Sequence, residues 1–302
     1  MSSRNLLNLA LLIALAVLIA LVIWEPGKEE PQEVKLTTLA ADQVTRFVIT
    51  RTGQADVFME KEDGSWMLHE PFGARANSFK IESILRLLEA KSHAQYDLAG
   101  KDLKQYKLDE PVAVINFDDS LTIYFGGNDP INHHRYVRID DTLHLITDTF
   151  YYQLAGKAHT FVDSALLAPE SKLTGLELPG LRLELQDDKW QVTPQPENFS
   201  ADSVTELIDA WQQAQAMSVE PYTAGEGGQR IRLRLRGESA ALEFRYRKTE
   251  SALVLALPDR GLQYLLPLDS EERLLRLPPP VEDAAPASEP LQGDEPAPPA
   301  AK

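Results

Sequence analysis

The sequence predicts an α+β protein: an N-terminal transmembrane helix followed by two tandem repeats of an antiparallel sheet with a packed helix. Three observations lead to this prediction. A long apolar stretch lies close to the N-terminus. A pattern of strand, turn, Trp, strand, Pro and helix occurs twice. Pairs of short strands around tight turns follow each occurrence, so each repeat is expected to fold as a hairpin, a helix and a meander.

Residues 1–24 are interpreted as a short cytoplasmic head and a membrane anchor. The run from Leu6 to Trp24 is apolar apart from one Asn, and about 20 such residues span ~30 Å of hydrocarbon. A signal peptide would show a shorter apolar core and a small-residue cleavage site. Representative anchor positions are Leu6, Leu12, Leu18 and Trp24. We therefore expect a single-pass membrane protein, with its N-terminus in the cytoplasm and the rest of the chain exported across the membrane.

A polar linker over 25–43 precedes the two predicted repeats, which cover 44–168 and 169–277. In each repeat an acidic turn separates two short strands, and Trp66 or Trp190 opens the second strand. This arrangement is typical of a β-hairpin. A proline then ends the second strand.

A helix is predicted after each hairpin. It begins at Asn77-Ser78 in the first repeat and at Ser200 in the second, where a side-chain oxygen can accept from exposed backbone N–H groups. Apolar residues recur every three or four positions, which gives each helix one face that can lie on a sheet. These residues are Ile81, Ile84, Leu85 and Leu88 in the first helix and Val204, Leu207, Ile208 and Trp211 in the second.

Two further strand pairs are predicted in each repeat. In the first repeat the pairs are 112–117 with 121–125 and 135–139 with 143–146; in the second they are 231–235 with 242–246 and 253–257 with 262–266. A short helix over about 149–158 follows the first meander. Residues 278–302 are rich in Pro, Ala and acidic residues, and this composition predicts a disordered tail.

Composition excludes several functions. The chain has 46 acidic and 30 basic residues, a net charge of -16, which argues against a nucleic-acid partner. It has no cysteine, so disulfides, thiolate metal ligands and cysteine nucleophiles are excluded. No nucleotide-binding or common hydrolase motif is present, so we predict no cofactor, no catalytic residue and no enzymatic activity. Gly126-Gly127 is interpreted as a β-turn that needs positive φ rather than as an anion-binding loop.

One strand departs from the general acidity. Arginine alternates with Ile or Leu over 230–236, so the guanidinium groups line one face of the strand. The candidate residues for binding an anion or a partner, including two from the next strand, are Arg230, Arg232, Arg234, Arg236, Arg245 and Arg247. Such a face suits lipid headgroups, glycan carboxylates or an acidic protein. The alternative is a solvated sheet face that is neutralised by acids such as Glu184.

Histidines are densest around His133, His134 and His144, which are weak candidates for a metal site because imidazole and carboxylate together suit zinc. Adjacent histidines on an extended chain point to opposite sides, however, and the nearby acids also suit hairpin turns and a helix cap at Asp148. No metal is therefore predicted. His69 has no evident partner in the sequence.

The residues of the first repeat resemble a known family. The resemblance rests on the hairpin Trp, the helix start and three short motifs, at Trp66, Ala76-Asn77, Tyr106–Pro111, Phe125-Gly126 and Arg135–Arg138. They are similar to a bacterial domain of unknown function in membrane-anchored envelope proteins, often encoded beside ABC transporters of the gliding-motility auxiliary type. The family pattern has Gly where Lys107 stands. The resemblance implies a location in the bacterial inner membrane, with most of the chain in the periplasm, and a transporter as the class of partner. It implies no catalytic residues.

We therefore expect a non-enzymatic, membrane-anchored periplasmic auxiliary or scaffold protein of an ABC-type transport complex. Its partners would be transporter subunits or other envelope proteins. Two alternatives remain open. One is an envelope module that binds an anionic lipid or glycan through Arg232 and Arg234. The other is a metal-assisted envelope enzyme that uses His133 and His134.

Overall fold

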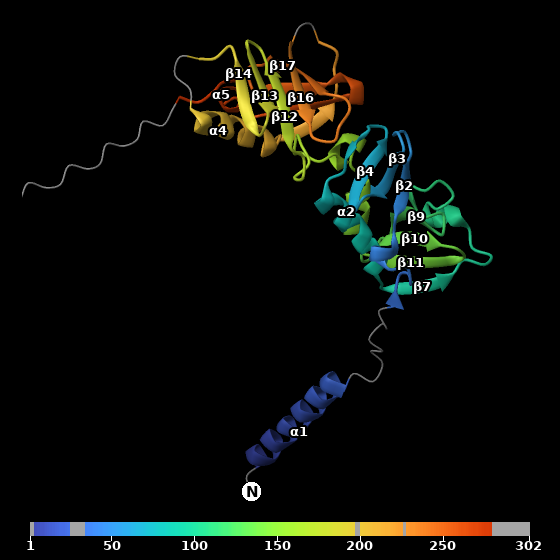
Figure 1. Ribbon diagram of the computed structural model, residues 1–302. Coiled ribbons are helices and arrows are strands. Elements are labelled where there is room, and N and C mark those ends of the chain that lie inside the picture. The colour runs from blue at the N-terminus through green and yellow to red at the C-terminus, as the bar shows by residue number, and fades with distance from the viewer. Residues whose placement is uncertain (1–2, 25–33, 197–199, 226–227, 280–302) are drawn as a thin grey trace, which may run out of the picture. The chain divides into compact units, whose positions relative to one another are not determined.

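The computed structural model describes residues 3–24, 34–196, 200–225 and 228–279. The protein is α+β, with mostly antiparallel sheets and few helices (Figure 1). The helices are α1 (Ser3–Trp24), α2 (Ser78–Leu85), α3 (Thr149–Leu154), α4 (Ala201–Gln212) and α5 (Ser270–Leu275). The chain divides into two compact units. The first contains residues 1–71 and 78–158, and the second contains residues 72–77 and those from 159 onward.

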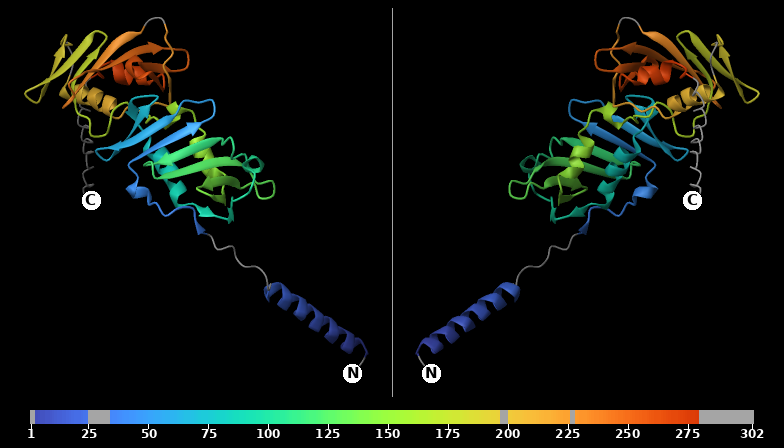
Figure 2. Two further views of the ribbon diagram at one scale, coloured as in Figure 1. Left: turned by 90° about the vertical axis from the view of Figure 1, so that its right-hand side faces the viewer. Right: turned by 90° about the vertical axis from the view of Figure 1, so that its left-hand side faces the viewer.

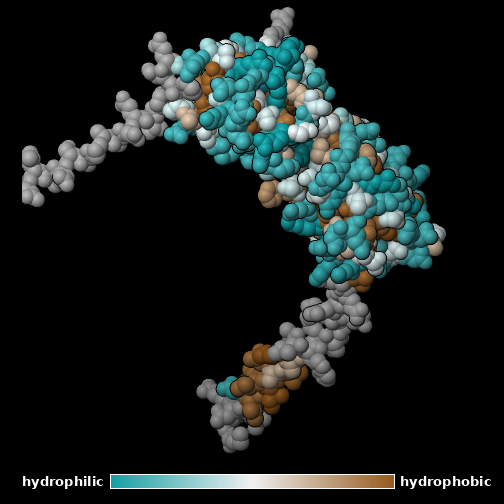
Figure 3. Space-filling model, in the orientation of Figure 1, coloured by the Kyte–Doolittle hydropathy of each residue, from teal (hydrophilic) through white to brown (hydrophobic). Residues whose placement is uncertain are grey.

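The N-terminal helix α1 has side chains that are described over residues 7–20, and all of them are exposed. Leu12 and Leu18 are 65% and 60% exposed, whereas the side chains of Leu6 and Trp24 lie outside the described residues. Figure 3 shows this helix as a hydrophobic surface, in contrast to the mainly hydrophilic surfaces of the two units. Among the described residues, none of the helices combines the length and the apolarity needed to cross a membrane.

The two flanking segments of the predicted organisation lie partly outside the described residues. In the linker over 25–43, description begins at residue 34, where β1 (Val34–Lys35) pairs with β6 (Lys91–Ser92). The tail predicted to be disordered is outside the described residues from 280 onward.

In the main antiparallel sheet of the first unit, neighbouring strands follow the order β4-β3-β2-β8-β9-β10-β11-β7. Its strands are β2 (Arg46–Arg51), β3 (Val57–Glu62), β4 (Ser65–Glu70), β7 (Ala94–Asp97), β8 (Ala113–Phe117), β9 (Leu121–Asn128), β10 (Arg135–Ile139) and β11 (Thr142–Ile146). The predicted hairpin and both predicted strand pairs are present. The strands β2 and β7 were not predicted. β2 pairs with β3 on one side and β8 on the other, so it joins the hairpin to the meander, and β7 pairs with β11 and forms the edge of the sheet at that end.

The second unit contains an eight-stranded sheet with the order β14-β13-β12-β16-β17-β18-β19-β15. Its strands are β12 (Leu173–Leu178), β13 (Leu181–Gln186), β14 (Lys189–Thr193), β15 (Ser218–Pro221), β16 (Gln229–Leu235), β17 (Leu242–Lys248), β18 (Leu253–Leu257) and β19 (Leu262–Leu266). Position by position, this order corresponds to that of the first sheet. The short strand β5 (Ala74–Arg75) lies in the segment 72–77.

The hairpin turns explain part of the chain's acidity. Aspartates at several turns have positive φ, among them Asp63 (48°), Asp118 (49°), Asp140 (48°) and Asp187 (48°). Among residues other than glycine, Asp and Asn tolerate this left-handed region best, because their short side chains hydrogen-bond locally. These carboxylates therefore serve turn geometry and carry no catalytic signal.

In each unit one helix, α2 in the first and α4 in the second, packs on one face of the sheet, which we call the inner face (Figure 2). In the second unit, Trp211 of α4 is fully buried 6.2 Å from Phe244 of β17, and its Nε1 donates to the Leu274 carbonyl at 2.8 Å. As predicted, Ser200 caps α4: its Oγ accepts from the Ser203 N–H at 3.1 Å. In the first unit α2 ends at Leu85 and continues as a 3₁₀ turn, earlier than predicted, but Leu88 is still buried.

The opposite, outer face of the first sheet is covered over β9, β10 and β11 by the connection between β7 and β8, residues 98–112. A small second core joins them: Leu98 and Leu108 of this connection pack with buried Leu143 of β11 and partly buried Leu103, Tyr106, Tyr124 and Tyr136. Gly126 and Gly127 lie in β9 under this connection, and neither has positive φ. The prediction of a turn there was wrong. A Cβ on Gly126 would lie 2.9 Å from Leu108 Cγ, so close approach of the connection explains the glycine.

Lys107 provides a first test of this connection. It has φ 55° and ψ 38° at the end of a 3₁₀ turn, a left-handed conformation that costs an L-residue roughly 1–2 kcal/mol. We expect Lys107→Gly to raise the free energy of unfolding by up to about 1 kcal/mol, because glycine removes the strain but loses more chain entropy on folding. Urea unfolding of the full chain measures this. Lys104→Gly, inside the turn, is the control and should destabilise; a Lys107→Gly protein less stable than the wild type would contradict the prediction.

Candidate functional site

The arginine-rich strand is β16, and its alternation is that of a half-buried strand. Ile231 and Leu233 are fully buried on the inner face, whereas Arg230, Arg232 and Arg234 project from the outer face. The neighbouring strand β17 continues the outer face in register, with Arg230 opposite Arg245 and Arg232 opposite Glu243. Arg236 was predicted to share this face, but β16 ends at Leu235 and Arg236 lies beyond it.

We call this surface the arginine face and define it by Arg182, Arg230, Arg232, Arg234, Arg245 and Arg247, together with Glu177, Glu184 and Glu243. Six guanidinium groups and three carboxylates give it a formal charge of 6 − 3 = +3 in a chain whose net charge is -16. The arginine face is therefore a local cationic surface on an acidic protein. The side chains of Arg230 and Arg234 are 54% and 51% exposed.

The three glutamates bridge four of the arginines, Arg182, Arg230, Arg232 and Arg234, into one network. Arg232 Nε donates to Glu243 Oε1 at 2.7 Å, and Arg234 Nη1 donates to Glu184 Oε1 at 2.9 Å. Arg234 also reaches Glu177 at 3.3 Å. The expectation that Glu184 would face the arginines is correct. Because these bonds cross from strand to strand, they hold the guanidinium groups in a fixed pattern.

Glu184 shows the electrostatic effect of this network. The hydrogen bond from Arg182 is the main cause that holds the pKa of the Glu184 carboxyl below its ordinary value, with further contributions from the charge of Arg182 and from Arg234. This carboxylate therefore remains charged at neutral pH. Among the described residues, no carboxylate lies within ion-pair distance of Arg245 or Arg247, so these two arginines keep their charge available.

The outer faces of the two units differ at corresponding strands. In the first unit, residues 98–112 cover the outer face over β9, β10 and β11. In the second unit the equivalent connection, between β15 and β16, spans 222–228. The outer face of β16 carries arginines where the first unit has Val112, Val114 and Asn116.

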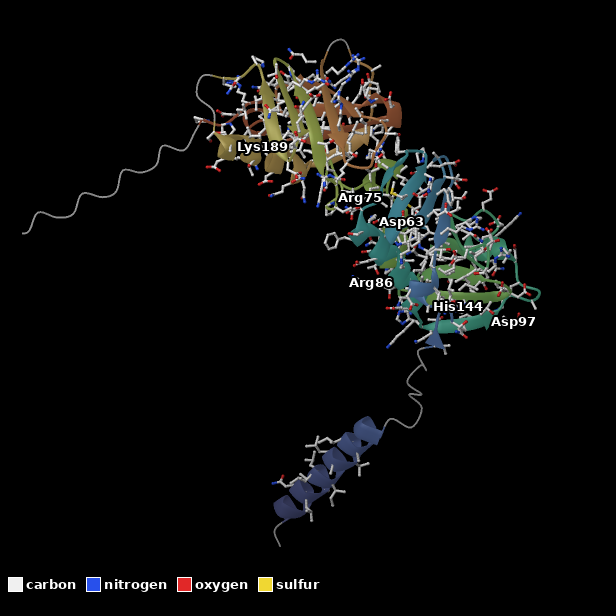
Figure 4. The ribbon with its side chains drawn as sticks, in the orientation of Figure 1. Asp63, Arg75, Arg86, Asp97, His144 and Lys189 are labelled. Atoms are coloured by element: carbon white, nitrogen blue, oxygen red, sulfur yellow. The ribbon has the colours of Figure 1, made fainter. Side chains whose placement is uncertain are left out.

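The predicted histidine cluster does not converge. His133 lies in an exposed turn with φ 58°, and His134 stacks on His93 with ring centroids 4.1 Å apart. Burial and the neighbouring His93 lower the pKa of His134. His144, labelled in Figure 4, is 6% exposed in β11 and lies 3.2 Å (Nδ1) from Ser92 Oγ; burial lowers its pKa. These three histidines therefore occupy separate environments and supply no shared set of metal ligands.

The prediction that Asp148 caps a helix with its side chain was wrong. Asp148 does precede α3, but its side chain makes no capping hydrogen bond to the helix. It accepts instead from Arg135 Nε at 2.7 Å, and Arg135 Nη1 donates to the Gly126 carbonyl at 2.7 Å. Arg135 is 7% exposed and lies over the ring of Tyr151 at 4.1 Å. This cluster is a structural ion pair.

Sequence reasoning missed one group with ligand chemistry. Glu60 and Glu62 of β3 and His69 of β4 project from the outer face of the first hairpin, and one ligand atom from each lies within 4.8 Å of the others. His69 Nε2 is 3.2 Å from Glu62 Oε1 and 3.7 Å from Glu60 Oε2. Counting alternation outward from the turn at Asp63, labelled in Figure 4, would have placed these side chains on one face. The view that His69 has no partner was therefore wrong.

Comparison with known protein families finds a match that spans parts of both units. Residues 66–229, from β4 in the first unit to the start of β16 in the second, match a protein family described as a domain of unknown function (DUF4340). No curated protein and no solved structure matches the chain.

Proposed function

The chain belongs to the family described as a domain of unknown function (DUF4340), and on this premise we propose that it is a membrane-anchored envelope protein that acts by binding a partner rather than by catalysis. The arginine face carries the proposal. It combines a local charge of +3 with side chains that are about half exposed, and the fold of the first unit shows that the sheet itself does not require arginines at these positions.

Membrane anchoring is supported by the N-terminal segment. Its sequence from Leu6 to Trp24 is apolar, and the described side chains of α1 are exposed on every side of the helix. A helix that is hydrophobic all round requires an apolar environment. We propose that the lipid bilayer supplies it, with the N-terminus in the cytoplasm and the two units in the periplasm.

The arrangement of charges favours a protein partner. Three glutamates lie among the six arginines, so the surface presents both signs in a fixed pattern. Complementary mixed charges on another protein can match such a pattern, which gives specificity. A uniformly anionic surface would meet repulsion from Glu177, Glu184 and Glu243. We therefore propose that the arginine face binds a subunit of an ABC-type transport complex, and we keep an anionic lipid or glycan as the second candidate.

Charge reversal tests this proposal. We expect Arg232→Glu with Arg234→Glu to weaken partner binding at least about tenfold, because placing like charges opposite each other in an interface costs several kcal/mol. The measurement is co-purification of transporter subunits with the tagged full chain from bacterial membranes. A matched control reverses two exposed cations of the first unit, Arg86→Glu with Lys104→Glu, and should keep the partner.

The outcomes separate the candidates. Recovery of the wild-type chain alone from mild detergent would contradict a transporter partner. Binding to vesicles of anionic lipid that is lost only in the Arg232 and Arg234 double variant would favour the lipid candidate. A thermal melt of each variant must first show that the fold is retained.

A further inference from the structure

The first hairpin places two carboxylates and one imidazole around a common point. Glu60 and Glu62 are two residues apart on β3 and therefore share the outer face. His69 lies across from them on β4 at a β-bulge, where Phe58 pairs with Glu70 and Met59 pairs with Leu68. The Phe58 ring lies 5.3 Å from the His69 imidazole and restricts its orientation.

We propose that Glu60, Glu62 and His69 bind one divalent transition-metal ion of the zinc type. Zinc takes His nitrogen and carboxylate oxygen at about 2.0–2.2 Å, so neighbouring ligand atoms of a tetrahedral site lie roughly 3.2–3.6 Å apart. The distances from His69 Nε2 to the two carboxylates, 3.2 and 3.7 Å, are close to this spacing. Three protein ligands leave a fourth position for water.

The second unit provides an internal comparison. Its hairpin, β13 with β14, pairs Glu184 with Gln191 and Leu183 with Val192, as β3 with β4 pairs Glu60 with Met67 and Met59 with Leu68. Glu184 thus corresponds to Glu60. Gln186, two residues on, corresponds to Glu62.

The hairpin of the second unit has no bulge, so no residue in it corresponds to His69. Its Glu184 contacts arginines instead of an imidazole. A hairpin of this fold therefore forms without the extra histidine and without the second carboxylate. The three ligands are a specific property of the first unit.

The local charge also favours a cation. Two carboxylates facing one imidazole leave an excess of negative charge, and a divalent ion cancels it. The mixture of nitrogen and oxygen donors favours a transition metal over Mg²⁺ or Ca²⁺, which prefer oxygen ligands alone.

Calorimetric titration of the purified full chain with zinc chloride at neutral pH, after treatment with a chelator, tests the site. We expect one zinc ion per chain, and magnesium should not compete. His69→Gln, and separately Glu60→Gln with Glu62→Gln, should weaken binding at least about tenfold, because disturbing even outer-shell partners of a metal costs about 10–100-fold. Zinc should also raise the melting temperature of the wild type but not of these variants.

The control is His133→Asn. His133 is an exposed histidine of the same unit, and its positive φ is one that asparagine adopts readily. This variant should bind zinc as the wild type does. The proposal would be overturned if the wild type bound no zinc, if the His69→Gln protein bound it equally well, or if His133→Asn removed binding.

Discussion

Asp148→Ala should destabilise the first unit by about 1–3 kcal/mol, the cost of leaving a buried hydrogen-bond donor without its partner. The change leaves the guanidinium of Arg135, only 7% exposed, without its carboxylate. Because the Asp148 side chain makes no capping hydrogen bond to α3, the loss of this pair is the main effect expected. Urea unfolding of the full chain, monitored on the first unit by hydrogen exchange, measures the difference.

A double variant makes this prediction sharper. Replacing both partners with apolar residues, Arg135→Met with Asp148→Leu, leaves no buried charge and should cost less than Asp148→Ala alone. The same ranking would not arise if Asp148 acted only through the start of α3. A double variant at least as unstable as Asp148→Ala would contradict the ion-pair interpretation.

The pair should also appear in the pH dependence of stability. Burial raises the pKa of Asp148, but the hydrogen bond from Arg135, with further hydrogen bonds and the Arg135 charge, outweighs it and holds the pKa below the ordinary 3.8. A carboxyl whose folded pKa is depressed stabilises the fold above its unfolded pKa and loses that contribution as the pH falls through the folded value. Wild type and Asp148→Ala should therefore differ fully at neutral pH and converge below about pH 3.8.

The sequence predicts local structure of this fold well and long-range structure poorly. The hairpins and meanders are signalled by adjacent residues, such as the aspartates of their turns, and the strands lie within a few residues of the predicted bounds. The strand β2 pairs with β8, with Ile49 opposite Ile115. These residues are far apart in the sequence, so no turn between adjacent strands indicates the pairing. The same reason explains Gly126, whose constraint comes from Leu108 in a different segment.

For the candidate sites too, features within one strand could be predicted, whereas contacts between segments could not. The arginine face could be predicted because alternation along one strand fixes which side chains share a face. The histidines around His133 were only weak metal candidates, and residues that are dense in the sequence need not be close in space: His134 and His144 lie in different surroundings. The group at His69 required the register of two strands, which follows from the turn at Asp63 but was not counted through.

Gly126→Ala should be among the most damaging single changes in the first unit. A methyl group there would meet the Tyr106 carbonyl well inside contact distance and Leu108 Cγ at 2.9 Å. Ordinary overpacking costs about 1–3 kcal/mol, and we expect at least the upper end of this range because a backbone carbonyl cannot rotate away. The connection 98–112 should also lift from the sheet and expose the small core around Leu98 and Leu143.

Gly127→Ala is the matched control for this change. Its added methyl group would lie 3.2 Å from Cδ of Lys107, a flexible side chain that can move aside, so the cost should be small. Both glycines lie in the same strand, have no positive φ, and gain the same single carbon. A difference in stability therefore reports the distance to the connection and not strand propensity. If Gly126→Ala and Gly127→Ala had equal unfolding free energies, or equal hydrogen exchange in residues 98–112, the connection would not be in close contact with Gly126.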